Sequence, residues 1–572
     1  MAYDCVIKGG MVLDGLGSPA FRADVAVKDG RIAEVIRMDG IAERAEKTGK
    51  AEKACPAEGC AAVPDAPALC VIDATGKYVT PGFIDIHRHA DLALFREGFG
   101  GAELKQGLTT IVNGNCGISP APLAPCAAEA GDGGIRRDFR DEVKRYIEPI
   151  TGPVPDRLPT GSVSEYLDAA EKVPGGLPLN IGTLAGAGTV RASVAGYEDR
   201  PLTDREYETV GSLLTGAVAD GALGVSLGLG YAPECFYTTE ELIRALSPLK
   251  ESGIPITAHM REEADNVLDA IKEMVTVARA LKTPVHLSHL KAIGAKEPEK
   301  RTEEMLSLIR RAREEGLDVS CDAYPYTAGS TQLLHVFPPE FLPGSTEERI
   351  GRLSDPEWRE RLKERMETGT DFENIVRLAG FENIFLSAVP SEKNKRYQGM
   401  SIAEAAKERG EEPFDTLFSL MAEEELGIAM IDFITTDDAI ALILKEPFSN
   451  VISDSTYPLG GLLHPRVYGT FARILEKFVR DEKRIPLPDA VAAMTSRAAD
   501  ALGLSAKGRI EPGADADICV FGISRVHEPG TYEKPDVFAE GMDEVLVNGV
   551  PVIHGGAFTG SRPGRVLRRK KQ

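Results

Sequence analysis

The sequence predicts an α/β fold: a (β/α)8 TIM-like barrel, a small β-sandwich domain formed from both chain termini, and an insertion before the last strand. Eight short apolar runs alternate with amphipathic helical patterns, which favours parallel strands joined by crossover helices. Polar residues able to bind a metal stand at the ends of several runs, where such a barrel places its active site. The runs begin at Phe83, Gly107, Leu177, Ala222, Ile254, Pro284, Asp318 and Asn450.

The parts of the chain differ in sequence character. Residues 81–499 are expected to form the barrel, whereas strand-turn-strand patterns over 1–80 and 500–572 predict the β-domain. Residues 39–70 are rich in Ala, Glu and Lys and are expected to be a surface insertion. Their three cysteines lack the paired spacing of a structural zinc site, which makes metal binding there the weaker alternative.

Two stretches interrupt the alternation of strands and helices. Residues 121–162 are rich in Pro, Gly and Ala and are expected to form a long loop near the barrel mouth. Residues 338–449 carry helical patterns, for example over 355–366 and 402–424. An insertion of this size is expected to pack over the barrel mouth, where it could serve as a lid.

Composition restricts the class of protein. The 572 residues are 43% hydrophobic and 27% charged, which is typical of a soluble globular enzyme, and the net charge of −22 argues against nucleic-acid binding. No run of 18 or more apolar residues predicts a membrane span. Nine scattered cysteines and the lack of a signal-peptide pattern indicate the cytoplasm. Self-association stays undetermined.

A short strand after Pro81-Gly82 carries the first metal-binding candidates. Side chains alternate along a strand, so His87 and His89 share one face and can bind one ion, although two solvated loop histidines would have the same spacing. Taken together, the metal-capable residues at the ends of the first, second, fifth, sixth and eighth predicted strands are His87, His89, Cys116, His259, His289 and Asp454. Imidazole and thiolate ligands together suit zinc, which lowers the pKa of bound water to roughly 7.

These residue types indicate metal-assisted hydrolysis of an amide or ester. Asp454 could accept a proton from the attacking water and deliver it to a leaving nitrogen. Cys116 follows a strand within a Gly-rich turn, which favours a ligand over a small buried apolar residue. His286 and His289 lie on opposite strand faces, and His289 is expected to point inward because it is nearer the strand end. Three further histidines are expected to be structural or solvated: His335, His527 and His554.

At these residues the sequence resembles the amidohydrolase superfamily and, within it, the N-acyl-D-amino-acid deacylases (D-aminoacylases). The resemblance covers nearly the whole chain, and its most specific stretches are Asn113-Gly114-Asn115-Cys116 and Tyr324-Pro325-Tyr326-Thr327-Ala328-Gly329-Ser330. His-x-His and Pro-Gly-Ala-Asp-Ala-Asp mark only the superfamily. Other matching segments are 81–89, 228–233, 259–263, 288–291 and 464–466.

The resemblance implies the roles of the site residues. It implies a tight zinc held by Cys116, His259 and His289, and a weaker second metal at His87 and His89 bridged by Cys116, where other branches use a carboxylated lysine. Asp454 matches the catalytic acid/base. The residues that match the substrate-binding positions are Lys291, Tyr324, Ser330 and Arg466 around the substrate carboxylate and Tyr231 near the acyl carbonyl.

Two departures leave the side-chain specificity open. Ala187 stands where the family usually carries a histidine, and residues 453–464 are more apolar than the corresponding family loop. The favoured function is zinc-dependent hydrolysis of a small-molecule N-acyl-D-amino acid. One alternative is a cyclic-amide hydrolase of the hydantoinase or dihydroorotase kind, which usually needs the carboxylated lysine. The other is a catalytically silent scaffold, which would have no need of an intact ligand set.

Overall fold

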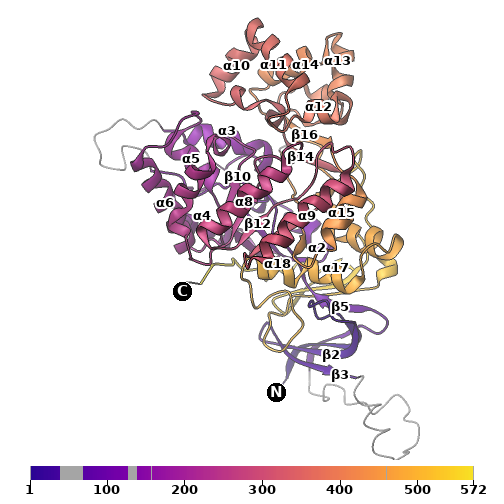
Figure 1. Cartoon of the computed structure of the whole chain (residues 1–572). Helices are drawn as coiled ribbons and strands as arrows, with labels where there is room; N and C mark the ends of the chain where they lie inside the picture. The colour runs from indigo at the N-terminus through magenta and orange to yellow at the C-terminus, as the bar shows by residue number, and fades with distance from the viewer. Residues whose placement is uncertain (1, 39–67, 126–137, 156, 459, 571–572) are drawn as a thin grey trace, which may run out of the picture.

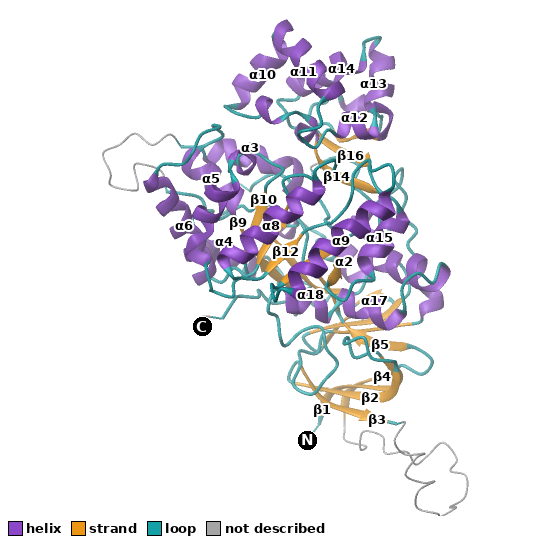
Figure 2. Ribbon diagram, viewed as in Figure 1, coloured by secondary structure: helices purple, strands orange, loops and turns teal. Residues whose placement is uncertain are grey.

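The computed structural model describes residues 2–38, 68–125, 138–155, 157–458 and 460–570. Figure 1 shows three parts along the long axis of the molecule: a β-domain beside the N-terminus, the α/β barrel in the middle, and a group of helices at the far end. The colouring by secondary structure in Figure 2 places a small sheet between the barrel and that group of helices.

Eight parallel strand positions form the barrel. Strand neighbours follow chain order, and an isolated parallel bridge between Arg88 and Ser455 joins the last strand to the first. This arrangement confirms the predicted barrel. The strands are β6 (Phe83–Asp85), β7 (Leu108–Asn113), β8 (Asn180–Thr183) continued by β9 (Ala185–Gly186), β10 (Val225–Gly228), β11 (Ile256–His259), β12 (Val285–Leu287), β13 (Val319–Ala323) and β17 (Ser449–Val451).

Amphipathic helices cover the outside of the barrel. In α6 (Asp204–Ala219), Tyr207, Val210, Leu214 and Ala217 repeat at helical spacing and are buried. The Thr203 side chain caps the first turn of α6 in a capping box with Glu206, which fixes where the helix begins. Other helices of this layer are α2 (Gly101–Lys105), α4 (Val163–Glu171), α5 (Ala187–Ala195), α7 (Thr239–Leu246), α8 (Val267–Leu281), α9 (Pro298–Glu314), α15 (Asp437–Leu444), α16 (Arg466–Arg473), α17 (Leu487–Met494) and α18 (Ser496–Ala501).

Strands from both chain ends share one sheet. Strand β5 (Tyr78–Pro81) pairs with β1 (Tyr3–Val12) on one side and with β18 (Ile518–Phe521) on the other. The remaining strands are β2 (Phe21–Lys28), β3 (Arg31–Arg37), β4 (Ala68–Asp73), β19 (Met542–Val547), β20 (Val550–His554) and β21 (Ala557–Phe558). The predicted insertion falls largely outside the described residues, which omit 39–67.

The segment between β13 and β17 forms the far part of the molecule. Its antiparallel strands β14 (Ala328–Gln332), β15 (Ile384–Ala388) and β16 (Ala429–Phe433) form a sheet with β16 in the middle. Its helices pack on a hydrophobic core that also includes Val143, Ile147 and Ile150 from outside the segment. These helices are α10 (Thr346–Ser354), α11 (Pro356–Thr368), α12 (Ile375–Ala379), α13 (Ile402–Arg409) and α14 (Pro413–Glu423).

Two local expectations are wrong. The helix expected over 402–424 is two helices, because Gly410 ends α13 in a left-handed conformation (φ +68°) and Pro413 starts α14. The loop expected over 121–162 contains α3 (Arg140–Thr151), which buries Val143, Ile147 and Ile150 at helical spacing despite an internal proline.

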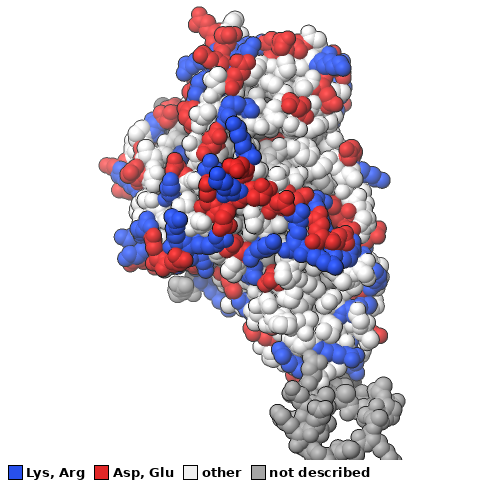
Figure 3. All heavy atoms as spheres, turned by 45° about the vertical axis from the view of Figure 1, so that its right-hand side comes forward, with Lys and Arg blue, Asp and Glu red and all other residues white. Residues whose placement is uncertain are grey.

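The helices and one face of the surface bear on the expected hydropathy and charge. No helix among the described residues is long and apolar enough to cross a membrane. On the face shown in Figure 3, basic and acidic side chains are interspersed across the middle of the molecule.

Candidate active site

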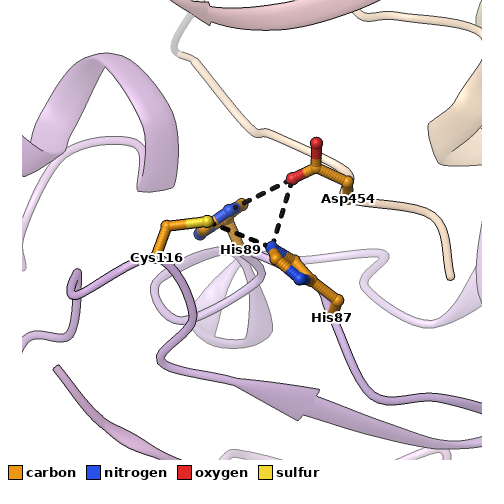
Figure 4. Close-up of side chains that lie close together, drawn as sticks. All are labelled: His87, His89, Cys116 and Asp454. Atoms are coloured by element: carbon orange, nitrogen blue, oxygen red, sulfur yellow. Dashed lines mark hydrogen bonds and ion pairs between the residues drawn. The ribbon is translucent and has the colours of Figure 1, made fainter. Parts of the chain in front are cut away.

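The predicted metal-binding residues converge at the carboxyl ends of the barrel strands. His259 is the last residue of β11, and the other five follow strands β6, β7, β12 and β17 within a few residues. Figure 4 shows His87, His89 and Asp454 facing one another beside Cys116. Because parallel strands end at one rim, residues far apart in sequence meet there.

Two groups of ligand atoms share the Cys116 sulfur. One group is His87, His89, Cys116 and Asp454, and the other is Cys116, His259 and His289; within each, the candidate ligand atoms lie within 4.8 Å of one another. Cys116 Sγ lies 3.2 Å from His87 Nε2 and 3.5 Å from His289 Nε2. His259 Nδ1 lies 3.0 Å from His289 Nε2.

These distances suit zinc. Bond lengths of about 2.0–2.3 Å in a tetrahedral site place ligand atoms roughly 3.3–3.6 Å apart, close to the separations observed here. Every member of both groups is buried. A buried thiol among three imidazole nitrogens is therefore a donor set that fits a structural or catalytic zinc better than a magnesium or calcium ion.

Three of these residues adopt a left-handed backbone conformation. Cys116 has φ +53°, His289 has φ +36° and Asp454 has φ +51°. Such values are uncommon for residues with side chains and cost free energy, of order 1–3 kcal/mol each. The fold therefore maintains these conformations at the point where the three side chains turn toward one another.

Electrostatics keep Asp454 ionised. Burial alone would raise the pKa of Asp454, but Arg466, whose Nη1 lies 3.0 Å from Asp454 Oδ2, and the neighbouring histidines hold this pKa well below its usual range. Asp454 Oδ1 lies 3.4 Å from Nε2 of both His87 and His89. A carboxylate that is charged and adjacent to the ligand groups can accept a proton there.

The protonation states of Cys116 and His259 also suit ligands. Burial would raise the pKa of the Cys116 thiol, but His87 and His289 lower it below its ordinary value. Burial, together with the nearby His289 and His335, lowers the pKa of His259 far below its ordinary value. A thiolate and a neutral imidazole are the forms that bind a metal.

Carboxylates behind the histidines orient them. His289 Nδ1 lies 3.1 Å from Glu263, which is also paired with Lys291. Asp322 accepts a hydrogen bond from the His289 backbone N–H and lies 2.8 Å from His286 Nε2. Sequence patterns alone assign no role to Glu263 and Asp322, although Asp322 stands at a strand end like the ligands. Glu263, which meets a ring nitrogen of His289, is a typical partner that fixes the tautomer of a ligating histidine, whereas Asp322 holds the His289 backbone.

A cavity lies above Cys116, His259 and His289, which form part of its lining. Of the predicted substrate-binding residues, Lys291, Tyr324, Ser330 and Tyr231 line it. The Tyr324 hydroxyl is buried without a hydrogen-bond partner among the described residues. The free hydroxyl marks a place where a bound molecule could supply a hydrogen-bond acceptor.

Arg466 lies behind the cavity wall. It is completely buried and is not among the residues that line the cavity. Its Nη2 donates a hydrogen bond to the Ser330 carbonyl (2.9 Å), and its guanidinium stacks 4.8 Å from the centre of the Tyr324 ring. Arg466 therefore fixes the positions of Asp454 and two substrate-binding candidates at once.

The segment between β13 and β17 supplies lining residues that sequence patterns do not identify. Glu373 and Asp432 line the cavity, as does His335, for which the sequence predicts a structural or solvated position. His335 Nε2 lies 3.0 Å from Glu373, and its ring centre lies 4.7 Å from that of Tyr231. Ala187, one of the two sequence departures, is not a lining residue.

Comparisons with known proteins agree with this geometry. The model of the amidohydrolase family matches residues 70–553, and the chain belongs to this family. It is 32% identical to a D-aminoacylase and 29% identical to an N-acyl-D-aspartate deacylase, both from Alcaligenes xylosoxydans xylosoxydans. These matches cover 99% of the chain and 98% and 95% of the two relatives.

A solved structure resembles the chain over its full length. It is an N-acyl-D-glutamate deacylase from Bordetella bronchiseptica in complex with zinc and a phosphonate inhibitor that mimics the tetrahedral intermediate. The two chains are 28% identical, with a TM-score of 0.78 and complete coverage of both.

Proposed function

We propose that the protein is a zinc-dependent deacylase that hydrolyses N-acyl-D-amino acids to a carboxylate and a free D-amino acid. The observation that carries this proposal is the pair of ligand groups sharing Cys116 at the base of a cavity, with Asp454 beside them. The substrates named for the relatives, N-acyl-D-aspartate and N-acyl-D-glutamate among them, support the choice of a D-amide.

The residues present fit one tight metal site and one weaker site. Cys116, His259 and His289 would hold the tight zinc, and His87 and His89 would hold the second metal with Cys116 shared. A related D-aminoacylase structure, 30% identical, is described as having a binuclear metal centre with one-metal activation and second-metal attenuation, which supports this division. When bound, zinc supplies an activated water and polarises the acyl carbonyl.

The side chains of the protein perform the remaining steps. Asp454, held ionised by Arg466, accepts the proton of the attacking water and delivers it to the leaving nitrogen. Lys291, Tyr324 and Ser330 bind the substrate carboxylate, because an ammonium group and two hydroxyls face the cavity together. Tyr231 lies beside His259, with ring centres 4.5 Å apart, and contacts the acyl end.

Metal analysis and paired substrates test the proposal. The purified protein is expected to contain about one tightly bound zinc per chain and to hydrolyse N-acetyl-D-methionine much faster than the L-enantiomer. Removal of zinc with a chelator should abolish turnover, and added zinc should restore it.

Other outcomes would favour the alternatives. Hydrolysis of hydantoin or dihydroorotate without turnover of linear amides would replace the proposal with a cyclic-amide hydrolase. A protein that binds zinc and hydrolyses neither class would be a scaffold.

The six described cysteines are unbridged, which supports a cytoplasmic location for the enzyme.

A further inference from the structure

One carboxylate in the cavity wall has no partner. Asp432, the residue before the end of β16, lines the cavity and is 2% exposed. No side chain or backbone group among the described residues forms a hydrogen bond or ion pair with its carboxylate. Leaving a buried carboxylate unpaired costs free energy, so a cavity with this wall favours a ligand that supplies the missing partner.

The other acidic groups that line the cavity are already paired. Glu263 is paired with Lys291, Glu373 with His335 and Asp454 with Arg466. Burial raises the pKa of Asp432 to about 6, and Glu373 adds to this, whereas His335, Lys291 and Arg466 act in the opposite direction. At neutral pH Asp432 is therefore predominantly a free negative charge.

Asp432 lies on the amino-acid side of the cavity. In the antiparallel pairing of β14 and β16 it is the register partner of Gly329, the residue before Ser330. A Cβ atom built on Gly329 would lie 2.9 Å from Asp432 Oδ1, so the glycine leaves the space in front of the carboxylate open. Ser330 and Tyr324 are assigned to the substrate carboxylate, which places Asp432 near the amino-acid half of the substrate and not its acyl group.

Apolar residues occur in the same cavity. Ile293, Ile375 and Ile434 line it together with Asp432. A side chain with a methylene stem and a cationic end matches this combination, because its stem can contact the isoleucines while its end reaches a carboxylate. An acidic side chain would instead bring a third carboxylate near Asp432 and Glu373.

We infer that the preferred substrates are N-acyl-D-amino acids with a cationic side chain of the lysine or arginine type, and that Asp432 is the residue that selects them. This inference rests on the proposed function. It separates the chain from its relatives that act on N-acyl-D-aspartate and N-acyl-D-glutamate, which carry the opposite charge.

The test compares Nα-acetyl-D-lysine with N-acetyl-D-norleucine, which has a similar stem and no charge. The wild-type ratio of kcat/KM values, lysine over norleucine, is expected to be tenfold or more, and N-acetyl-D-glutamate is expected to be the poorest of the three. Asp432→Asn should lower the ratio at least tenfold, mainly through a higher KM for the lysine substrate. Asp415→Asn, the same change at a side chain 57% exposed on α14, should leave the ratio unchanged.

The outcomes separate this inference from the proposed function. A wild-type ratio near or below one, or an unchanged ratio in a folded, zinc-containing Asp432→Asn protein, would overturn the role of Asp432 while D-deacylase activity on norleucine stands. Absence of turnover for every D-substrate would overturn both.

Discussion

The barrel rim and the β14–β16 sheet form two sides of one cavity, and they differ in what they contribute. The rim provides the ligand groups and Asp454, positioned by the ends of parallel strands. The β14–β16 sheet and its helices provide Asp432 and Glu373, which line the cavity and belong to neither ligand group. If Asp432 selects the substrate as inferred, this fold can change its substrate without changing its chemistry, because that residue belongs to the inserted segment and not to the rim.

The largest expected effect tests the rim. Asp454→Asn keeps the shape of the side chain and removes the proton acceptor, so kcat is expected to fall by roughly 10³-fold for every substrate. Zinc content should stay unchanged, as measured by metal analysis of the purified variant. Asp415→Asn serves as the matched control with normal kcat. A loss smaller than tenfold would show that proton transfer does not depend on Asp454.

A smaller effect is expected where the two sides of the cavity join. Arg466→Gln leaves Asp454 buried without its cation, which should lower the free energy of unfolding by about 3 kcal/mol in a denaturant titration. Because the pKa of Asp454 then rises, the acid limb of the kcat/KM profile should move to higher pH. Arg244→Gln, which breaks an exposed pair with Asp204, should change neither quantity. An unmoved acid limb would contradict the assigned role of Arg466.

The smallest expected effect concerns the β14–β16 sheet alone. Asp432 has a pKa of about 6, raised by burial, and it is faced by His335, Glu373, Lys291 and Arg466. As pH falls through 6 the carboxylate becomes protonated, so preference for Nα-acetyl-D-lysine over N-acetyl-D-norleucine should decline, by up to about tenfold between pH 8 and pH 5. Taking the ratio cancels changes in Asp454 that affect both substrates. In Asp432→Asn the ratio should be independent of pH, and a pH-dependent ratio in that variant would assign the titration to another group.

The sequence predicted the rim better than the opposite wall for a physical reason. His87, His89, Cys116, His259 and Asp454 are at or just after short apolar runs, and strand ends meet in a barrel whatever the loops do. The eight strands and the grouping of their end residues therefore follow from local sequence patterns.

Local sequence could not identify Asp432 or Glu373. They are two of 88 acidic residues, and nothing in their neighbourhood distinguishes them from solvated ones. Asp432 reaches the cavity because β16 pairs with β14, and Glu373, just before α12, is brought there by the same inserted segment. Asp322 is a different case, since it lies at the end of β13 and the strand-end signal alone could have identified it.

The shared terminal sheet has a consequence for biosynthesis. Strand β5 ends at Pro81, but its partner β18 begins at Ile518. At translation rates of roughly 5–20 residues per second, β5 waits on the order of 20–90 s after leaving the ribosome before β18 exists. Throughout that time the edge of β5 that later pairs with β18 is unpaired, so nascent protein should be more prone to aggregation before β18 is made than afterwards.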